Sequence, residues 1–139
     1  MVSLTPIESP RTVTVSEGEK SIAYYSTMPG RPVKLRVVGP TTLELLTRFD
    51  YDPTMRGTQT YRLVVEDGRR KLREIALKTT KATTATYTDL RDRVPSKFDR
   101  VQLPIDQGLH LITVSLAAPV RGAAEIHARI PQPAVGNEE

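Results

Sequence analysis

The chain of 139 residues contains no cysteine and no tryptophan, and aromatic side chains make up only 5% of it. The lack of cysteine excludes disulfides, thiolate metal ligands and cysteine nucleophiles. The scarcity of aromatic side chains argues against nucleic acid as a partner, because proteins that bind single strands stack the bases on aromatic rings. No apolar run is long enough for a spanning helix, and the opening residues lack the pattern of a signal peptide.

The sequence also lacks the motifs on which common enzyme sites depend. It has no glycine-rich phosphate loop, no nucleophile elbow and no metalloprotease histidine pair. The two histidines, His110 and His127, each fall inside an apparent strand, and we interpret both as structural. With no convergent set of reactive side chains, we expect a noncatalytic protein without a cofactor.

Apolar residues instead recur at every second position, the pattern of half-buried strands. Residues 33–37 alternate in this way, and residues 43–51 direct Leu43, Leu45, Phe49 and Tyr51 inward and Glu44, Arg48 and Asp50 outward. Turn signals about every ten residues separate eight or nine such segments. They predict an all-β antiparallel sandwich with jelly-roll or Greek-key wiring. We expect one domain over residues 11–131, a flexible segment over 1–10 and a frayed tail over 132–139.

Residues 61–77 read as a hairpin around Asp67 and Gly68, a dipeptide suited to a two-residue turn. Beyond the turn the alternation slips, since Leu72 and Ile75 cannot share one face of a regular strand. We interpret the slip as a β-bulge, with a short helix over residues 70–78 as the alternative.

The Thr-rich run over residues 83–88 favours extended backbone and predicts an edge strand. The charged segment that follows predicts an exposed loop at one rim of the sandwich, where ligand contacts tend to occur. We therefore identify Tyr87, Asp89, Arg91 and Arg93 as candidate contacts for a protein or glycan partner.

Two alternative binding surfaces remain open. Residues 62–100 hold eleven basic and six acidic side chains, against a net charge of +4 for the whole chain. Within them Arg69, Arg70, Lys71 and Arg73 form a basic cluster that would bind a polyanion, a nucleic acid or an acidic glycan, with salt-dependent affinity. A carbohydrate site would use an exposed ring, and Tyr25, Tyr51 and Tyr87 are the candidates.

Asp50 and Asp52 lie two apart and would share one face of a strand. Paired carboxylates serve glycosidases, and carboxylate oxygens in loops bind calcium. The segment lacks the dense Asp, Asn and Gly spacing of a dedicated calcium loop. We therefore interpret the two acids as a solvated strand end that pairs with neighbours such as Arg48 or Arg56, and a calcium site or a glycan-active enzyme that uses Asp50 and Asp52 remains the alternative.

The run YYSTMPGRPVKLRVVGPTTLELLTRFD has an aromatic strand, a Pro-Gly turn and two alternating strands, and VQLPIDQGLHLITVSL has a late turn and strand. In these patterns the chain resembles the bacterial pre-peptidase C-terminal type β-sandwich domains. That resemblance implies a noncatalytic module appended to a secreted enzyme or surface protein. It covers about half the chain and transfers no binding residue.

Taken together, these patterns predict a noncatalytic β-sandwich binding module, accessory to a larger secreted or surface assembly. The Thr-rich and Pro-rich strand composition favours an extracytoplasmic, periplasmic or secreted location. Exposed strand edges would also permit a homodimer through strand pairing.

Overall fold

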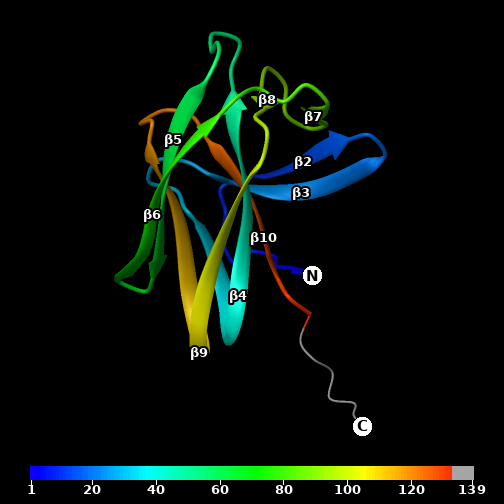
Figure 1. Ribbon diagram of the computed structural model, residues 1–139. Coiled ribbons are helices and arrows are strands. Elements are labelled where there is room, and N and C mark those ends of the chain that lie inside the picture. The colour runs from blue at the N-terminus through cyan, green and yellow to red at the C-terminus, as the bar shows by residue number, and fades with distance from the viewer. Residues whose placement is uncertain (133–139) are drawn as a thin grey trace.

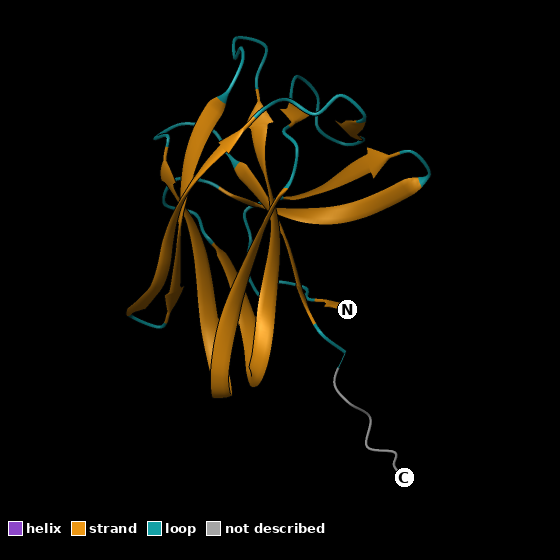
Figure 2. Ribbon diagram, viewed as in Figure 1, coloured by secondary structure: helices purple, strands orange, loops and turns teal. Residues whose placement is uncertain are grey.

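The computed structural model describes residues 1–132, and its regular structure is entirely β (Figures 1 and 2). The strands are β1 Val2–Ser3, β2 Thr12–Glu17, β3 Lys20–Thr27, β4 Val33–Tyr51, β5 Gln59–Asp67, β6 Arg70–Thr79, β7 Ala85–Tyr87, β8 Val94–Pro95, β9 Asp99–Ala118 and β10 Ala124–Ile130. The all-β class predicted from the alternation is confirmed. No helix occurs in this range, so none is long and apolar enough to cross a membrane.

All ten strands belong to one hydrogen-bonded antiparallel network. The main path runs β6-β5-β9-β4-β10-β3-β2-β7, with β1 paired to β10 and β8 paired to β4. Many neighbours are distant in sequence: β4 pairs with β9, and β10 lies between β4 and β3. Such non-local pairing is the pattern of jelly-roll and Greek-key folds rather than of a simple meander.

The sheet becomes two layers because the long ribbon of β4 and β9 folds back on itself (Figure 1). Gly39 pairs with Gly108 at the bend, and the register shifts there between Gly39 and Thr41. A Cβ atom at position 39 would lie 1.8 Å from the backbone oxygen of Asp106, so only glycine fits. Beyond the bend, β5 pairs with the last part of β9, whereas β10 pairs with the last part of β4.

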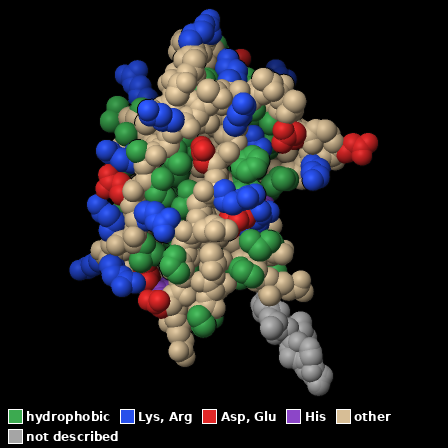
Figure 3. Space-filling view, in the orientation of Figure 1, with side chains coloured by type: hydrophobic (Ala, Val, Ile, Leu, Met, Phe, Trp, Pro, Cys, Tyr) green, Lys and Arg blue, Asp and Glu red, His purple; other side chains and the backbone are tan. Residues whose placement is uncertain are grey.

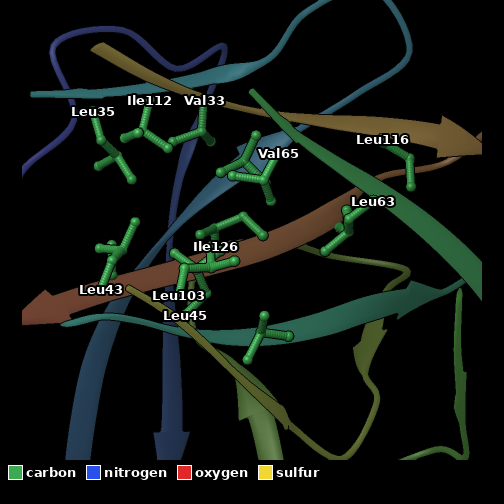
Figure 4. Packing of buried hydrophobic residues seen from close by; sticks show 14 of the residues in the cluster. Val33, Leu35, Leu43, Leu45, Leu63, Val65, Leu103, Ile112, Leu116 and Ile126 are labelled. Atoms are coloured by element: carbon green, nitrogen blue, oxygen red, sulfur yellow. The ribbon is translucent and has the colours of Figure 1, made fainter. Parts of the chain in front are cut away.

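The main core fills the space between the two layers (Figure 4). Leu35 and Ile112 come from one layer and Leu45 and Ile126 from the other, and all four are almost completely buried. Phe49 and Tyr61 stack with ring centroids 5.3 Å apart. This burial of apolar surface is the principal stabilising term of the fold.

A second, smaller core lies on the opposite face of β4. The β2–β3 hairpin and β7 cover that face, where Leu46 packs with Val13, Val15, Tyr24 and Tyr87. The sheet therefore curls over β4 and encloses both of its faces along residues 43–51.

This second covering corrects one prediction. Glu44, Arg48 and Asp50 do alternate with the core residues, but they are buried rather than exposed to solvent. Glu125 on β10 is also fully buried. Alternation identifies the two faces of a strand, and it does not reveal whether another hairpin lies over the polar face.

Two local predictions are confirmed. The slip after the hairpin turn is a bulge, since Val65 pairs with Arg73 and Glu66 with Lys71, which leaves Leu72 as the extra residue. The helical alternative is excluded, because β6 is extended throughout. The Thr-rich run does contain an edge strand, although β7 has only three residues and pairs with β2 alone.

The segment over residues 1–10, predicted to be flexible, is hydrogen-bonded to the sheet. Val2 and Ser3 pair with β10, the Leu4 amide donates to the Ala128 carbonyl at 2.8 Å, and Glu8 forms a bridge with Lys34. The predicted tail over 132–139 lies, except for Gln132, outside the described residues.

Candidate ligand-binding surface and buried carboxyl cluster

Two carboxyl groups meet beneath the β2–β3 hairpin. Asp50 of β4 and Glu125 of β10 are both inaccessible to solvent, and Arg11 bridges them, with Nη2 3.1 Å from an oxygen of each. The Ser26 hydroxyl donates to Glu125 Oε1 at 2.8 Å, and the Tyr87 hydroxyl donates to Asp50 Oδ1. These five residues are the carboxyl cluster.

Burial raises the pKa of both carboxyl groups in the carboxyl cluster. The pKa of Glu125 is raised well above its ordinary range, by burial first and then by the adjacent charge of Asp50. The two raised pKa values have the same physical cause, since two carboxyl groups out of water and next to each other disfavour the charged form, and the Arg11 guanidinium opposes this effect at both of them. Burial also raises the pKa of Tyr87, so its hydroxyl stays protonated.

The carboxyl cluster is closed to chemistry. Asp50 and Glu125 are 2% and 0% exposed, and each of their carboxyl oxygens accepts at least one hydrogen bond from within the protein. A catalytic acid or base must reach a substrate atom directly or through one water. We conclude that this cluster holds β10, β4 and the β2–β3 hairpin together.

Arg48 lies on the same face of β4, two residues before Asp50, and its environment differs. Its Nε donates to the Tyr24 hydroxyl at 3.2 Å and its Nη1 to the Ser96 carbonyl at 2.9 Å. The remaining nitrogen, Nη2, has Glu17 Oε1 as its nearest carboxylate oxygen at 3.7 Å, beyond hydrogen-bond distance. The side chain is only 5% exposed, yet it lines an open hollow.

The strand β8 and the residues after it position the other wall of this hollow. The Ser96 amide donates to the Phe49 carbonyl, and the Phe49 amide donates to Ser96 Oγ, both at 2.8 Å. The Lys97 amide donates to the Thr80 carbonyl at 2.9 Å. Pro95 and Ser96 are buried, so this part of the segment predicted as an exposed loop is instead packed against β4.

These bonds place Lys97 and Phe98 on a ridge between two hollows. The first, of about 330 Å³, is lined by Glu17, Arg48, Ala82, Thr83, Thr84, Lys97 and Phe98. The second, of about 390 Å³, is lined by Thr58, Lys78, Thr79, Thr80, Lys97, Phe98 and Asp99. We call the ridge and its two hollows the Phe98 surface.

The Phe98 ring is 46% exposed although it is large and apolar. The guanidinium groups of Arg48 and Arg100 lie over it, 5.5 and 5.9 Å from the ring centroid. These cation–π contacts fix the ring and place positive charge beside it. An exposed aromatic ring, cations and threonine hydroxyls together form a surface suited to a polar, extended ligand.

The candidate contact residues predicted around the rim separate into two groups. Tyr87 belongs to the carboxyl cluster and is only 9% exposed, so it cannot present its ring to a partner. Asp89 is exposed and accepts a hydrogen bond from the Thr14 amide at 2.9 Å, which fastens the loop to β2. Arg91 and Arg93 are exposed on the same loop.

The basic cluster of Arg69, Arg70, Lys71 and Arg73 lies at the β5–β6 turn, and all four side chains are exposed. Several are already partnered: Lys71 Nζ lies 2.9 Å from Glu74 Oε1, and Arg73 Nη1 donates to the Gln102 carbonyl at 3.0 Å. Figure 3 shows Lys and Arg side chains dispersed over the visible face with Asp and Glu among them. The visible face therefore has no continuous patch of side chains of one charge sign.

The side chains of Asp50 and Asp52 are both hydrogen-bonded within the protein. Asp50 is paired with Arg11, and Asp52 accepts hydrogen bonds from the Thr54 side chain and amide, which lower the pKa of Asp52. Among residues 1–132 there is no group of three His, Cys, Asp or Glu side chains that could hold a metal ion. The predicted pairing of Asp50 with Arg48 or Arg56 is wrong, because Arg11 is its partner.

The two histidines make side-chain contacts away from the Phe98 surface. His110 Nδ1 lies 2.6 Å from Asp67 Oδ2, and its Nε2 lies 2.8 Å from the Asp106 carbonyl oxygen. The bond to Asp67 raises the pKa of His110. His127 bridges the Ala23 carbonyl and the Ser3 hydroxyl.

The sequence did not single out Phe98, Lys97, Glu17 or Arg48 as binding residues. Phe98 stands at the end of a charged loop, just before an alternating strand, so its exposure carries no signal in the sequence. Arg48 appeared to be an ordinary outward residue of a strand. A scan against models of known protein families found no match, and a search of curated proteins found no relative.

Proposed function

We propose that this protein is a noncatalytic binding module, accessory to a larger assembly, and that its ligand lies across the Phe98 surface. The observation that carries the proposal is the exposed Phe98 ring between two hollows that threonine hydroxyls and cations line. The shape suits an extended polar chain, such as a polysaccharide, with one unit on each side of the ring. Rigid strands position the ridge, as is usual for binding surfaces of β-sandwiches.

The contrast with the carboxyl cluster supports a noncatalytic role. Asp50 and Glu125, two carboxyl groups whose pKa burial raises, are partnered inside the protein and do not line the Phe98 surface. Asp99, which does line it, is occupied by the Tyr61 hydroxyl at 3.2 Å. The surface thus offers hydrogen bonds, charge and a ring, which are the elements of recognition.

The test is to measure retention of the protein on immobilised polysaccharides by affinity electrophoresis, comparing Phe98→Ala with Leu109→Ala. Leu109 is a matched control because it is also a large apolar residue, 66% exposed, and lines neither hollow. We expect Phe98→Ala to weaken retention about tenfold, the effect of losing an aromatic contact. Loss of retention in the Leu109 variant, with none in the Phe98 variant, would contradict the proposal.

A further inference from the structure

The hollow under Arg48 contains a carboxylate of the protein itself. Glu17, at the end of β2, extends its side chain over the hollow, where Oε2 accepts a hydrogen bond from the Thr84 hydroxyl at 2.6 Å. Its other oxygen is the one 3.7 Å from Arg48 Nη2. The Glu17 side chain is 50% exposed, beside the β2–β3 turn.

The guanidinium of Arg48 is not satisfied by this arrangement. An arginine has five N–H donors, and hydrogen bonds within residues 1–132 use the Nε and Nη1 groups of Arg48. The Arg48 side chain is only 5% exposed and lines the hollow, and its Nη2 forms an ion pair with Glu17 at 3.7 Å, which is too long for a hydrogen bond. A buried cation left in this state favours a closer anion, since charge-assisted hydrogen bonds to carboxylate form at about 2.7–2.9 Å.

We infer that Glu17 marks the place of a ligand carboxylate, and that the ligand of the Phe98 surface is an acidic polysaccharide whose uronate group displaces Glu17 from Arg48. This inference rests on the proposed function. The ligand carboxylate would take the Nη2 donor of Arg48 and the Thr84 hydroxyl, with Lys97 on the far wall of the same hollow. The sugar hydroxyls would meet the exposed Thr58 and Thr80 across the ridge.

The composition of the surface favours a glycan over the other polyanions. A single-stranded nucleic acid is held by successive aromatic platforms, and Phe98 is the aromatic residue that lines the two hollows. Four exposed threonines contribute hydroxyls that both donate and accept, and they match the hydroxyl-rich surface of a sugar chain: Thr58, Thr80, Thr83 and Thr84.

The decisive comparison uses two forms of one polymer. Polygalacturonate carries a carboxylate on each unit, and its fully methyl-esterified form has the same backbone without the charge. We expect the full chain to bind polygalacturonate at least about tenfold more tightly than the ester in isothermal titration calorimetry, because only the carboxylate can pair with Arg48.

The variant Glu17→Gln removes the competing charge and keeps the shape of the side chain. We expect it to bind polygalacturonate about fivefold more tightly than wild type and the ester no more tightly. Glu19→Gln is the matched control, because Glu19 is exposed on the same hairpin turn, loses the same charge and does not line the hollow. Equal thermal unfolding midpoints for the two variants would establish that both remain folded.

The outcomes separate the two proposals. If binding depends on Phe98 but the ester binds as well as the acid, or Glu17→Gln has no effect, the carboxylate inference is overturned and the binding module stands. Tighter binding of dextran sulfate, polyglutamate or oligo-dT than of polygalacturonate would also overturn it, in favour of a sulfated glycan, an acidic peptide or a nucleic acid. If no probe shows binding sensitive to Phe98→Ala, both proposals fail.

Discussion

Arg48 and Asp50 lie on the same face of one strand, two residues apart, but their side chains have different hydrogen-bonding environments. Asp50 lies in the carboxyl cluster, where Arg11, Glu125 and Tyr87 satisfy it completely. Arg48 is equally buried, but one side of its guanidinium faces an open hollow and a distant carboxylate. Burial alone therefore does not distinguish a structural polar residue from a binding residue. The two are distinguished by whether all the donors and acceptors of the side chain are hydrogen-bonded within the protein.

The difference has a topological cause. The β2–β3 hairpin crosses over β4 and closes the space above Asp50, where β10 and β7 bring in Glu125 and Tyr87. At Arg48 the cover consists of the end of β2 and the loop over residues 82–84, which leave a hollow between them. The same curled sheet thus produces a sealed cluster and, beside it, an open surface.

The largest effect is expected from removing one member of the carboxyl cluster. Glu125→Ala leaves the Ser26 hydroxyl without its carboxylate acceptor, removes one of the two carboxylates that Arg11 contacts and opens a cavity, so we expect a loss of about 3 kcal/mol in the free energy of unfolding. Glu17→Ala, which removes a half-exposed acid, should cost less than about 1 kcal/mol. Urea unfolding of both variants measures the two values. Equal losses of unfolding free energy in the two variants would contradict the difference between the carboxyl cluster and the Phe98 surface.

A smaller effect, with a characteristic pH dependence, is expected from Glu125→Gln. The pKa of Glu125 is raised well above its ordinary value of 4.5, so the folded protein keeps a proton that the unfolded chain releases. The resulting stabilisation is complete below pH 4.5 and is lost as pH rises through the folded pKa. In wild type the free energy of unfolding should therefore fall over this range. Glutamine cannot ionise, so the variant should show a smaller fall, which leaves the part due to the raised pKa of Asp50, whereas the exposed control Glu19→Gln should retain the whole fall.

A loss of about 1 kcal/mol is expected from Tyr87→Phe, because it removes one hydrogen bond to Asp50 and keeps the packing of the ring. Binding of polysaccharide should not change, since Tyr87 lines neither hollow. Thermal unfolding and calorimetry check the two halves of this prediction. If Tyr87→Phe weakens binding as much as Phe98→Ala, the binding surface extends to β7 and the comparison between the two regions must be redrawn.

More of the fold than of the candidate site could be predicted from the sequence. Alternation identified the inward residues of β4, such as Leu43 and Leu45, and the phase slip revealed a bulge after the hairpin turn, because both are properties of a single strand and its partner. The covering of β4 by β2 and β3 depends on pairing between distant segments, as Arg11, Asp50 and Glu125 illustrate. The exposure of Phe98 has the same origin, so local patterns could not predict it.

The smallest effects are expected in the loop over residues 88–93, which leads from β7 to β8. Asp89→Ala removes one hydrogen bond to the exposed Thr14 amide and should cost about 0.5 kcal/mol, whereas Arg91→Ala should leave the free energy of unfolding within about 0.5 kcal/mol of wild type. Neither residue lines a hollow, so neither variant should change the affinity for polysaccharide by more than about twofold.

The measurement is calorimetric titration of both variants and of Lys97→Ala. The Lys97 ammonium lies on the ridge, and its loss should weaken the affinity for polysaccharide about fivefold. Arg91 and Lys97 each carry one positive charge, so a difference between the two variants reflects where each cation lies. If Arg91→Ala weakens binding more than Lys97→Ala, the contact surface is the rim loop and not the ridge.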